Sequence, residues 1–288
     1  MQSENKPKNP ALLAEKAAKI RLLAVDAVYH AKSGHPGGSL SIADILAYLY
    51  FEKMNVDPKN PNNPDRDRFV LSKGHCCPAL YAALAIKGFF PEEDLNTLRH
   101  LGSYLSGHPD MKHVPGVDMS TGSLGQGFSA ANGMALTGKR TGKKYHVYTV
   151  LGDGEIQEGQ VWEAAMFAAH YKLGNLTAFV DFNHLQIDGD VRDIMNPTPI
   201  DKKFEAFGWH TQVIDGHDFD AIAQAVANAE QDERPSVIVC TTTKGKGVSY
   251  MENQVGWHGK APKDAEYEIA MNELRAAYEK AKEELCNG

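Results

Sequence analysis

The sequence predicts an α/β protein with a doubly wound, mostly parallel sheet and helices on both of its faces. Apolar runs at 69–71, 147–151, 176–180, 209–214 and 236–240 alternate with segments of helical periodicity, which is typical of β-α-β units. The central unit ends one strand in Gly152-Asp153-Gly154 and places Asn183 just after the next. Because open parallel sheets bind ligands beyond the carboxyl ends of their strands, this unit predicts a binding site as well as a fold.

The remaining elements follow in order along the chain. Helices are predicted at 12–31, 41–53, 77–87, 124–136, 202–207, 219–230 and 263–284. Ser39 or Ser41 is expected to cap the second helix, and Pro91 to open a further short helix with an acidic first turn. Segments 55–67, 101–121 and 186–199 are predicted loops, and the length of 101–121 indicates a functional segment.

The length of 288 residues suits a single domain, 1–288, with a polar N-terminal tail at 1–10 and a charged C-terminal helix within 259–288. A net charge of −7 without a basic helix face argues against nucleic-acid binding. The sequence shows neither an apolar signal core nor a run long enough to cross a bilayer, so a cytoplasmic location is expected. The four cysteines lack a metal-binding spacing and are expected to be free thiols.

Asp153 and Asn183 are candidate metal ligands because their oxygens suit Mg²⁺ holding a phosphate-bearing cofactor. Gly152 and Gly154 would let the backbone approach a diphosphate, and the following helix would offer N–H groups to it. The alternative is that the side chains of Asp153 and Asn183 merely cap turns. Lys244-Gly245-Lys246-Gly247 either adds positive charge near the phosphate or is a solvated loop.

Gly152-Asp153-Gly154 followed by Asn183 resembles the thiamine diphosphate motif. Six further segments resemble, in order, the motifs of transketolase over about residues 17–261. They are Ser33-Gly34-His35-Pro36-Gly37-Gly38-Ser39, Leu71-Ser72-Lys73-Gly74-His75, Ser106-Gly107-His108-Pro109, Thr121-Gly122-Ser123-Leu124-Gly125-Gln126-Gly127, Gly154-Glu155-Ile156-Gln157-Glu158-Gly159 and Trp257-His258-Gly259. The resemblance covers only the N-terminal, diphosphate-binding half of an ordinary transketolase, and it implies the diphosphate-binding domain of the thiamine diphosphate-binding fold.

The resemblance also implies a set of site residues. Asp153, Asn183 and the backbone carbonyl of Leu185 would bind Mg²⁺, for which Ca²⁺ or Mn²⁺ could substitute. Thiamine diphosphate would contact His75, Gly122, Ser123, Leu124, Gly154, Glu155, Asn183 and His258. His35, His108 and His258 would be catalytic, since imidazoles can donate to oxyanions and move protons near neutral pH. Glu158 would be catalytic by bonding a glutamate of the partner half that protonates the aminopyrimidine of the cofactor. Many full-length relatives carry Pro where Ser123 stands, a departure that leaves the glycines and Leu124 unchanged.

The implied activity is transfer of a two-carbon ketol unit from a ketose phosphate to an aldose phosphate, as in the pentose phosphate pathway. The resemblance implies that the pyrimidine-binding domain lies on a separate C-terminal subunit and not on this chain, in a heterotetramer with two of each chain. One alternative is a component of another two-chain thiamine diphosphate enzyme, such as a 2-oxo acid dehydrogenase or decarboxylase. The other is a non-catalytic binding subunit that retains the fold.

Overall fold

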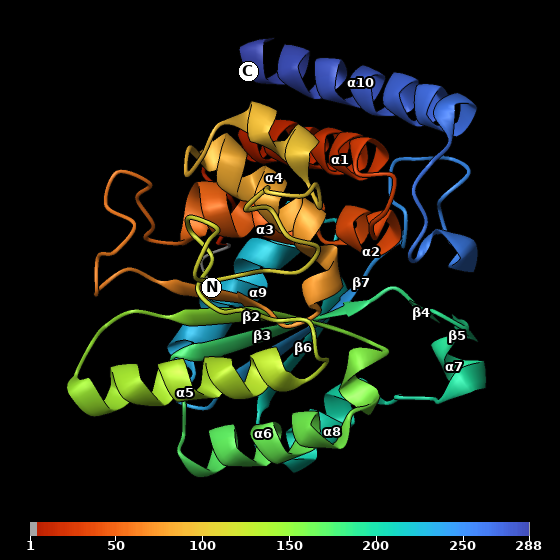
Figure 1. Ribbon diagram of the computed structural model, residues 1–288. Helices are drawn as coiled ribbons and strands as arrows, with labels where there is room; N and C mark the ends of the chain where they lie inside the picture. Colours follow the sequence, from red (N-terminus) through yellow and green to blue (C-terminus); the bar gives the residue numbers. More distant parts are fainter. Residues whose placement is uncertain (1–4, 288) are drawn as a thin grey trace.

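Five parallel strands form the centre of the protein in the computed structural model, which describes residues 5–287 (Figure 1). Their order across the sheet is β1 (Arg68–Leu71), β2 (Val147–Gly152), β3 (Leu176–Phe182), β7 (Ser236–Thr241) and β6 (His210–Asp215). Every neighbouring pair is parallel, so all five carboxyl ends lie at one edge. The predicted fold class is therefore confirmed.

Helices cover both faces because the strand side chains alternate between two apolar cores. Tyr148 and Phe179 face one core, which is closed by α1 (Pro10–His30), α3 (Ala43–Tyr48), α4 (Cys77–Lys87) and α9 (Phe219–Gln231). Val147 and Ala178 face the other, which is closed by α5 (Gln126–Thr141), α6 (Gly159–His170) and α8 (Ile200–Ala206). The long helix α10 (Asp264–Asn287) packs along the outer side of α1 (Figure 1).

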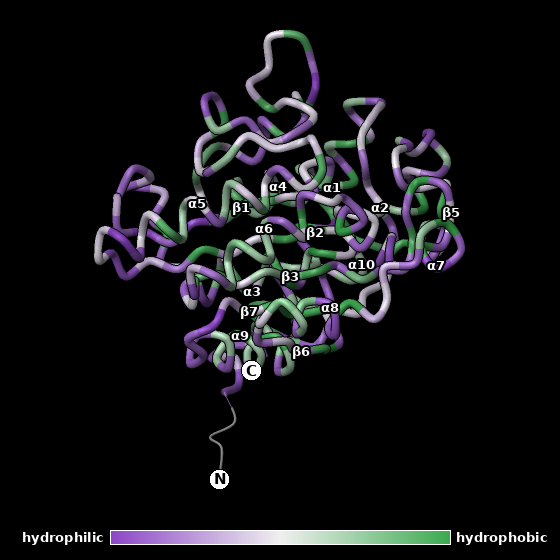
Figure 2. Tube along the Cα trace, turned by 90° about the horizontal axis from the view of Figure 1, so that it is seen from below, coloured by the Kyte–Doolittle hydropathy of each residue, from purple (hydrophilic) through white to green (hydrophobic). Residues whose placement is uncertain are grey.

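Hydropathy follows this layered arrangement. Figure 2 shows apolar stretches along the central strands and largely polar loops at the periphery. Asn9 caps the N-terminus of α1, where its side chain accepts a hydrogen bond from the Leu12 N–H at 2.9 Å.

Residues 1–4 of the predicted polar tail, and residue 288 of the predicted C-terminal segment, lie outside the described residues. Within residues 5–287, no helix combines the length and apolar character that crossing a bilayer requires.

The helix predicted over 41–53 is present from residue 43, but it ends as a π-helix and a separate short helix precedes it. The chain forms α2 (Pro36–Ser41), then α3, and then the π-helix η1 (Leu49–Lys53). Neither predicted cap acts as one, because the Ser39 hydroxyl donates to the His35 carbonyl at 2.7 Å and the Ser41 hydroxyl to the Asp181 carboxylate at 2.7 Å. Both serines are buried, so their hydroxyls bond acceptors inside the protein instead of free helix N–H groups.

The predicted loop at 186–199 contains short regular elements. Two antiparallel strands, β4 (Leu185–Gln186) and β5 (Gly189–Asp190), lead into α7 (Val191–Ile194). Four 3₁₀ turns complete the described chain: η2 (Gly74–Cys76), η3 (Glu92–Thr97), η4 (Glu155–Gln157) and η5 (Val255–Trp257). The predicted loop at 101–121 contains no regular element. Asp153, Asn183 and the 101–121 segment therefore stand on irregular backbone beyond the strand ends, supported by the sheet.

Candidate active site

A cavity of about 370 Å³ opens at the carboxyl edge of the sheet. It is lined by segments that follow β1, β2, β3 and β7, together with the start of α2. All but two of the predicted site residues line it, namely His35, His75, Gly122, Leu124, Asp153, Gly154, Glu155, Glu158, Asn183, Leu185 and His258. His108 and Ser123 are not part of this lining, although the His108 ring lies beside Gly122.

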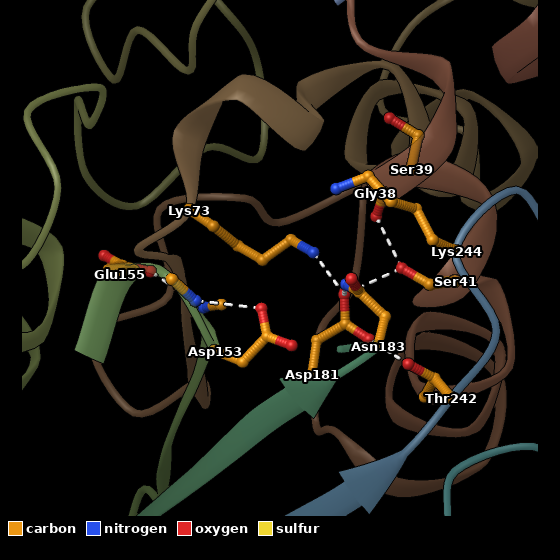
Figure 3. A network of polar contacts seen from close by, with 12 residues as sticks. Gly38, Ser39, Ser41, Lys73, Asp153, Glu155, Asp181, Asn183, Thr242 and Lys244 are labelled. Atoms are coloured by element: carbon orange, nitrogen blue, oxygen red, sulfur yellow. Dashed lines mark hydrogen bonds and ion pairs between the residues drawn. The ribbon is translucent and has the colours of Figure 1, made fainter. Parts of the chain in front are cut away.

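The buried carboxylate of Asp181, near the end of β3, joins the segments around the cavity (Figure 3). Lys73 forms an ion pair with it, and the Thr242 hydroxyl donates to its second oxygen. Ser41 Oγ and Asn183 Nδ2 donate to Asp181 Oδ2 at 2.7 and 2.8 Å. Burial opposes ionisation, but Lys73 and the other donors hold the pKa of Asp181 below its usual value. These contacts let a charged carboxylate remain in the interior.

The contact with Asp181 also orients the amide of Asn183. Because Nδ2 faces Asp181, Oδ1 is directed to the other side, where the Leu185 N–H donates to it at 3.2 Å. Asp153 stands just beyond the neighbouring strand β2, and its Oδ2 accepts from the His184 N–H at 2.7 Å. The structure thus brings the Asp153 carboxylate and the amide oxygen of Asn183 to adjacent strand ends, as the sequence predicted.

Lys244 enters the cavity from the segment after β7. Its ammonium donates to the Leu185 carbonyl at 2.9 Å and lies 3.0 Å from His258 Nδ1. The residue is only 2 % exposed, and no carboxylate of residues 5–287 lies at ion-pair distance from it. Burial and the nearby Lys73 ammonium lower its pKa. Because a buried ammonium without an anionic partner is costly, this position favours an anionic ligand.

The oxygen donors fit a hard divalent cation. A carboxylate, an amide oxygen and a backbone carbonyl, supplied by Asp153, Asn183 and Leu185, match the preference of Mg²⁺. The Leu185 carbonyl has a second lone pair besides the one that accepts from Lys244. Burial, followed by the charge of Asp181, raises the pKa of Asp153 to about 7. A bound cation would favour the ionised carboxylate, so the residues present fit the predicted ion.

Four histidines lie close together, three of them in the cavity lining. The ring centroid of His35 lies 5.2 Å from that of His75, 5.6 Å from that of His258 and 6.3 Å from that of His108. Burial, aided by Arg99, lowers the pKa of His35 to about 4, and burial with Lys244 lowers that of His258 to about 3. Burial also lowers the pKa values of His75 and His108. The rings are therefore neutral near pH 7 and can each donate at one nitrogen and accept at the other.

Glu155 holds the cavity wall together. Its Oε1 accepts from Ser72 Oγ at 2.5 Å and from the Gly125 N–H at 2.8 Å, and its Oε2 accepts from the Gly152 N–H at 3.0 Å. Burial raises the pKa of this carboxyl group. Since all three donors are protein groups, the carboxylate ties the end of β2 to the segments before α4 and α5. A direct contact between Glu155 and a cofactor stays a prediction.

Glu158 and Ser123 are exposed at the rim of this region. Glu158 stands immediately before α6, and its side chain makes no hydrogen bond or ion pair with residues 5–287. Ser123 makes no side-chain hydrogen bond within the same range. A catalytic role for Glu158 and a cofactor contact by Ser123 stay predictions.

Sequence reasoning missed four residues that organise the cavity: Ser41, Lys73, Asp181 and Thr242. Lys73 lies inside one of the transketolase-like motifs, but no role was predicted for it. Asp181 carried the clearest signal, since a charged residue in an apolar strand, two positions before Asn183, shares its face of the sheet. The open question about Lys244 is resolved in part, because it lines the cavity and Lys246 does not.

Comparison with known proteins gives a family match over nearly the whole chain. The family model described as "Transketolase, thiamine diphosphate binding domain" matches residues 13–283. A 6-deoxy-6-sulfo-D-fructose transketolase subunit from Clostridium sp. (strain MSTE9) is 49 % identical over 263 residues, covering 91 % of this chain and 96 % of that subunit. An apulose-4-phosphate transketolase subunit from Phocaeicola vulgatus is 43 % identical, covering 92 % of this chain and 95 % of that subunit.

Transketolases with longer chains are similar over less than half of their length. Human transketolase is 45 % identical over 264 residues, which are 90 % of this chain and 42 % of that protein. The crystal structure of transketolase from Campylobacter jejuni superposes with a TM-score of 0.87 at 33 % identity, covering 95 % of this chain and 46 % of that one. The similarity therefore extends over the fold and the cavity together.

Replacing Lys73 with Met should destabilise the protein by about 3–5 kcal/mol, because the Asp181 carboxylate would stay buried without its counter-charge. Urea denaturation measures this free energy of unfolding. The double variant Lys73→Met with Asp181→Asn should be more stable than Lys73→Met alone, since the unpaired charge is then removed.

Lys19→Met is the matched control, because its pair with Glu92 is much more exposed and should contribute less than about 1 kcal/mol. Equal losses for Lys73→Met and Lys19→Met would contradict a stabilising role for the buried pair.

Between about pH 4 and 6.5, His35 should make the protein more stable as the pH rises. His35 has a folded-state pKa of about 4, below the ordinary value, so in this window the unfolded chain binds a proton that the folded chain does not. His35→Gln should reduce the slope of unfolding free energy against pH by at most about 1.4 kcal/mol per pH unit. Denaturation at a series of pH values tests this, and an unchanged slope would show that His35 titrates normally.

Proposed function

This chain belongs to the transketolase family, and we propose that it is the N-terminal, thiamine diphosphate-binding subunit of a transketolase built from two kinds of chain. The proposed reaction is transfer of a two-carbon ketol unit from a ketose to an aldose. One observation supports it above the others: the buried Lys244 ammonium has no carboxylate of residues 5–287 at ion-pair distance and stands beside three oxygen donors suited to Mg²⁺. A magnesium diphosphate would supply both missing charges.

In this proposal, Asp153, Asn183 and the Leu185 carbonyl hold Mg²⁺, while Lys244 and His75 face the diphosphate. Gly122 and Leu124 form the wall against which the rings of the cofactor would lie. Thiamine diphosphate supplies the electron sink that lets the bond between the second and third carbons of a ketose break.

The histidines orient the sugar and move protons. Among residues 5–287, His35 Nδ1 is buried without a hydrogen-bond partner, so it is available to a hydroxyl or carbonyl oxygen of the substrate. Neutral rings at His35, His108 and His258 can accept a proton from a hydroxyl group or donate one to a developing oxyanion. The rings of His108 and His258 lie 6.3 and 5.6 Å from that of His35, which supports their acting on one substrate.

The surface around the cavity supports a partner subunit. Glu158 is an exposed carboxylate at the rim. Three further exposed side chains are apolar: Ile187 in the β4–β5 turn, which lines the cavity, Ile194 at the end of α7, and Met195 directly after it. We propose that a C-terminal subunit carrying the pyrimidine-binding domain covers this rim, with a carboxylate opposite Glu158, in a heterotetramer with two of each chain. A cytoplasmic location stays a prediction.

For the two sugars of the reaction we propose two candidate classes. A ketose phosphate donor and an aldose phosphate acceptor, as in the pentose phosphate pathway, are the first candidates. A sulfonated ketose is the second, because a relative that is 49 % identical is named for 6-deoxy-6-sulfo-D-fructose. Assaying phosphorylated and sulfonated ketoses side by side with the reconstituted two-chain enzyme separates the two candidates.

Asp153→Ala should abolish Mg²⁺-dependent binding of thiamine diphosphate, since it removes the one carboxylate of the proposed metal site. Calorimetric titration with and without EDTA measures this, on the chain and on the two-chain enzyme. Asp188→Ala, an equal change of charge on an exposed residue of the β4–β5 turn, should bind as the unmodified chain does. Unimpaired binding by Asp153→Ala would favour a non-catalytic subunit.

Glu158→Gln should leave binding of thiamine diphosphate to this chain within about threefold, yet lower kcat of the two-chain enzyme by roughly 100-fold or more, the range of a lost acid–base group. Glu233→Gln, an exposed change away from the cavity, should not alter kcat. If Glu158→Gln retained full activity, the proposed pairing of Glu158 with the partner subunit would be wrong.

A further inference from the structure

A largely buried chain of charged and polar groups lies outside the cavity, and none of its side chains lines the cavity. It begins at Arg21 on α1, whose guanidinium pairs with the carboxylate of Asp44 on α3, with Nη1 3.1 Å from Oδ1 and Nη2 bonded to Oδ2. Arg21 Nε also donates to the Leu40 carbonyl at 3.2 Å. Asp44 is only 5 % exposed, and although burial opposes its ionisation, Arg21 and His217 hold its pKa below the usual value.

The imidazole of His217, just after β6, bonds at both of its nitrogens. Its Nδ1 lies 2.7 Å from Asp44 Oδ2, and its Nε2 lies 2.9 Å from the backbone nitrogen of Thr243. A backbone N–H can only donate, so Nε2 must be the acceptor and carry no proton. The proton is then on Nδ1, where it is donated to Asp44. The contacts thus select the neutral Nδ1–H tautomer of His217.

Thr243 immediately precedes Lys244, and this short segment is held in place at every residue. The Thr242 hydroxyl donates to Asp181, and the Thr243 N–H donates to His217. The Lys244 carbonyl accepts from the Asn253 N–H at 2.9 Å, and the Gly245 N–H donates to the Gly37 carbonyl at 2.9 Å.

The side chain of Lys244 has little room to adjust on its own. A Cβ atom placed at Gly37 would lie 3.2 Å from Lys244 Cγ, which shows that the backbone of α2 packs closely against the lysine. The position of the ammonium in the cavity therefore depends on the position of the Lys244 backbone. The hydrogen bond from the Thr243 N–H to His217 helps to fix that backbone.

We propose that His217 is a positioning residue for the cofactor site. It connects the Arg21–Asp44 pair, fixed between α1 and α3, to the backbone of Thr243, and so sets where the Lys244 ammonium stands. The inference rests on the proposed function, in which Lys244 faces the diphosphate. Small displacements of such groups weaken a binding site, so a residue without direct ligand contact can control affinity.

Two substitutions separate positioning from general stabilisation. Asn at position 217 can keep an N–H donor for Asp44 but is too short to accept from Thr243, whereas the longer Gln can offer its amide oxygen to Thr243 and an amide N–H to Asp44. His217→Asn should weaken binding of thiamine diphosphate with Mg²⁺ by about fivefold or more, the effect of one lost hydrogen bond, and His217→Gln by less than about twofold. Calorimetry on the two-chain enzyme measures both affinities, and thermal unfolding is recorded beside it.

Two further readouts do not depend on the cofactor. Nitrogen-15 NMR of the histidine-labelled chain should show His217 as the Nδ1–H tautomer at neutral pH, identified by the signal lost in His217→Gln. Hydrogen exchange followed by mass spectrometry should show faster exchange in a peptide spanning residues 241–245 for His217→Asn, but not for His217→Gln.

Lower unfolding temperatures for both variants with unchanged affinity would overturn the inference and leave His217 a structural residue. An Nε2–H tautomer, or equal exchange rates in the two variants, would do the same. Lys244→Met and Asp153→Ala are titrated in parallel. If these two also bind as the unmodified protein does, the proposed function has failed, and the NMR and exchange results still decide whether His217 holds Thr243.

Discussion

The buried ion pair between Lys73 and Asp181 is the interaction on which the rest of the cavity depends. It brings the end of β3 and the segment after β1 together in the interior, and further donors from α2 and the segment after β7 complete it (Figure 3). Through the same carboxylate, the amide of Asn183 acquires its orientation. Four segments distant in the sequence therefore share one acceptor, and losing its charge balance would disturb all of them at once.

Of the two buried lysines beside the cavity, one has a carboxylate partner and the other has none among residues 5–287, and this difference indicates a site for an anionic ligand. Lys73 is neutralised by Asp181, whereas the equally buried Lys244 bonds a carbonyl and an imidazole and has no carboxylate of residues 5–287 at ion-pair distance. The carboxylate of Asp153 would be stabilised by a further positive charge beside it, because burial and the charge of Asp181 raise its pKa to about 7. A cation with an anionic ligand would satisfy Asp153 and Lys244 together, and stabilise the folded protein as it binds.

Much of this arrangement could be predicted from the sequence, and the exceptions have physical causes. Strand periodicity placed β2 and β3, and with them Asp153 and Asn183, while the histidine-bearing motifs brought His35, His75 and His258 to one cavity. The hydrogen bond of the Ser41 hydroxyl could not be predicted, because its acceptor on Asp181 is 140 positions away in the sequence. The β4–β5 hairpin could not be predicted either, because two-residue strands are too short to show periodicity.

The most direct test is a crystal structure of the two-chain enzyme grown with thiamine diphosphate and Mn²⁺, located by its anomalous scattering. We expect one Mn²⁺ peak bound by Asp153 Oδ, Asn183 Oδ1 and the Leu185 carbonyl, with the diphosphate against Lys244. A diphosphate bound elsewhere, or a metal that these three oxygens do not bind, would contradict the account.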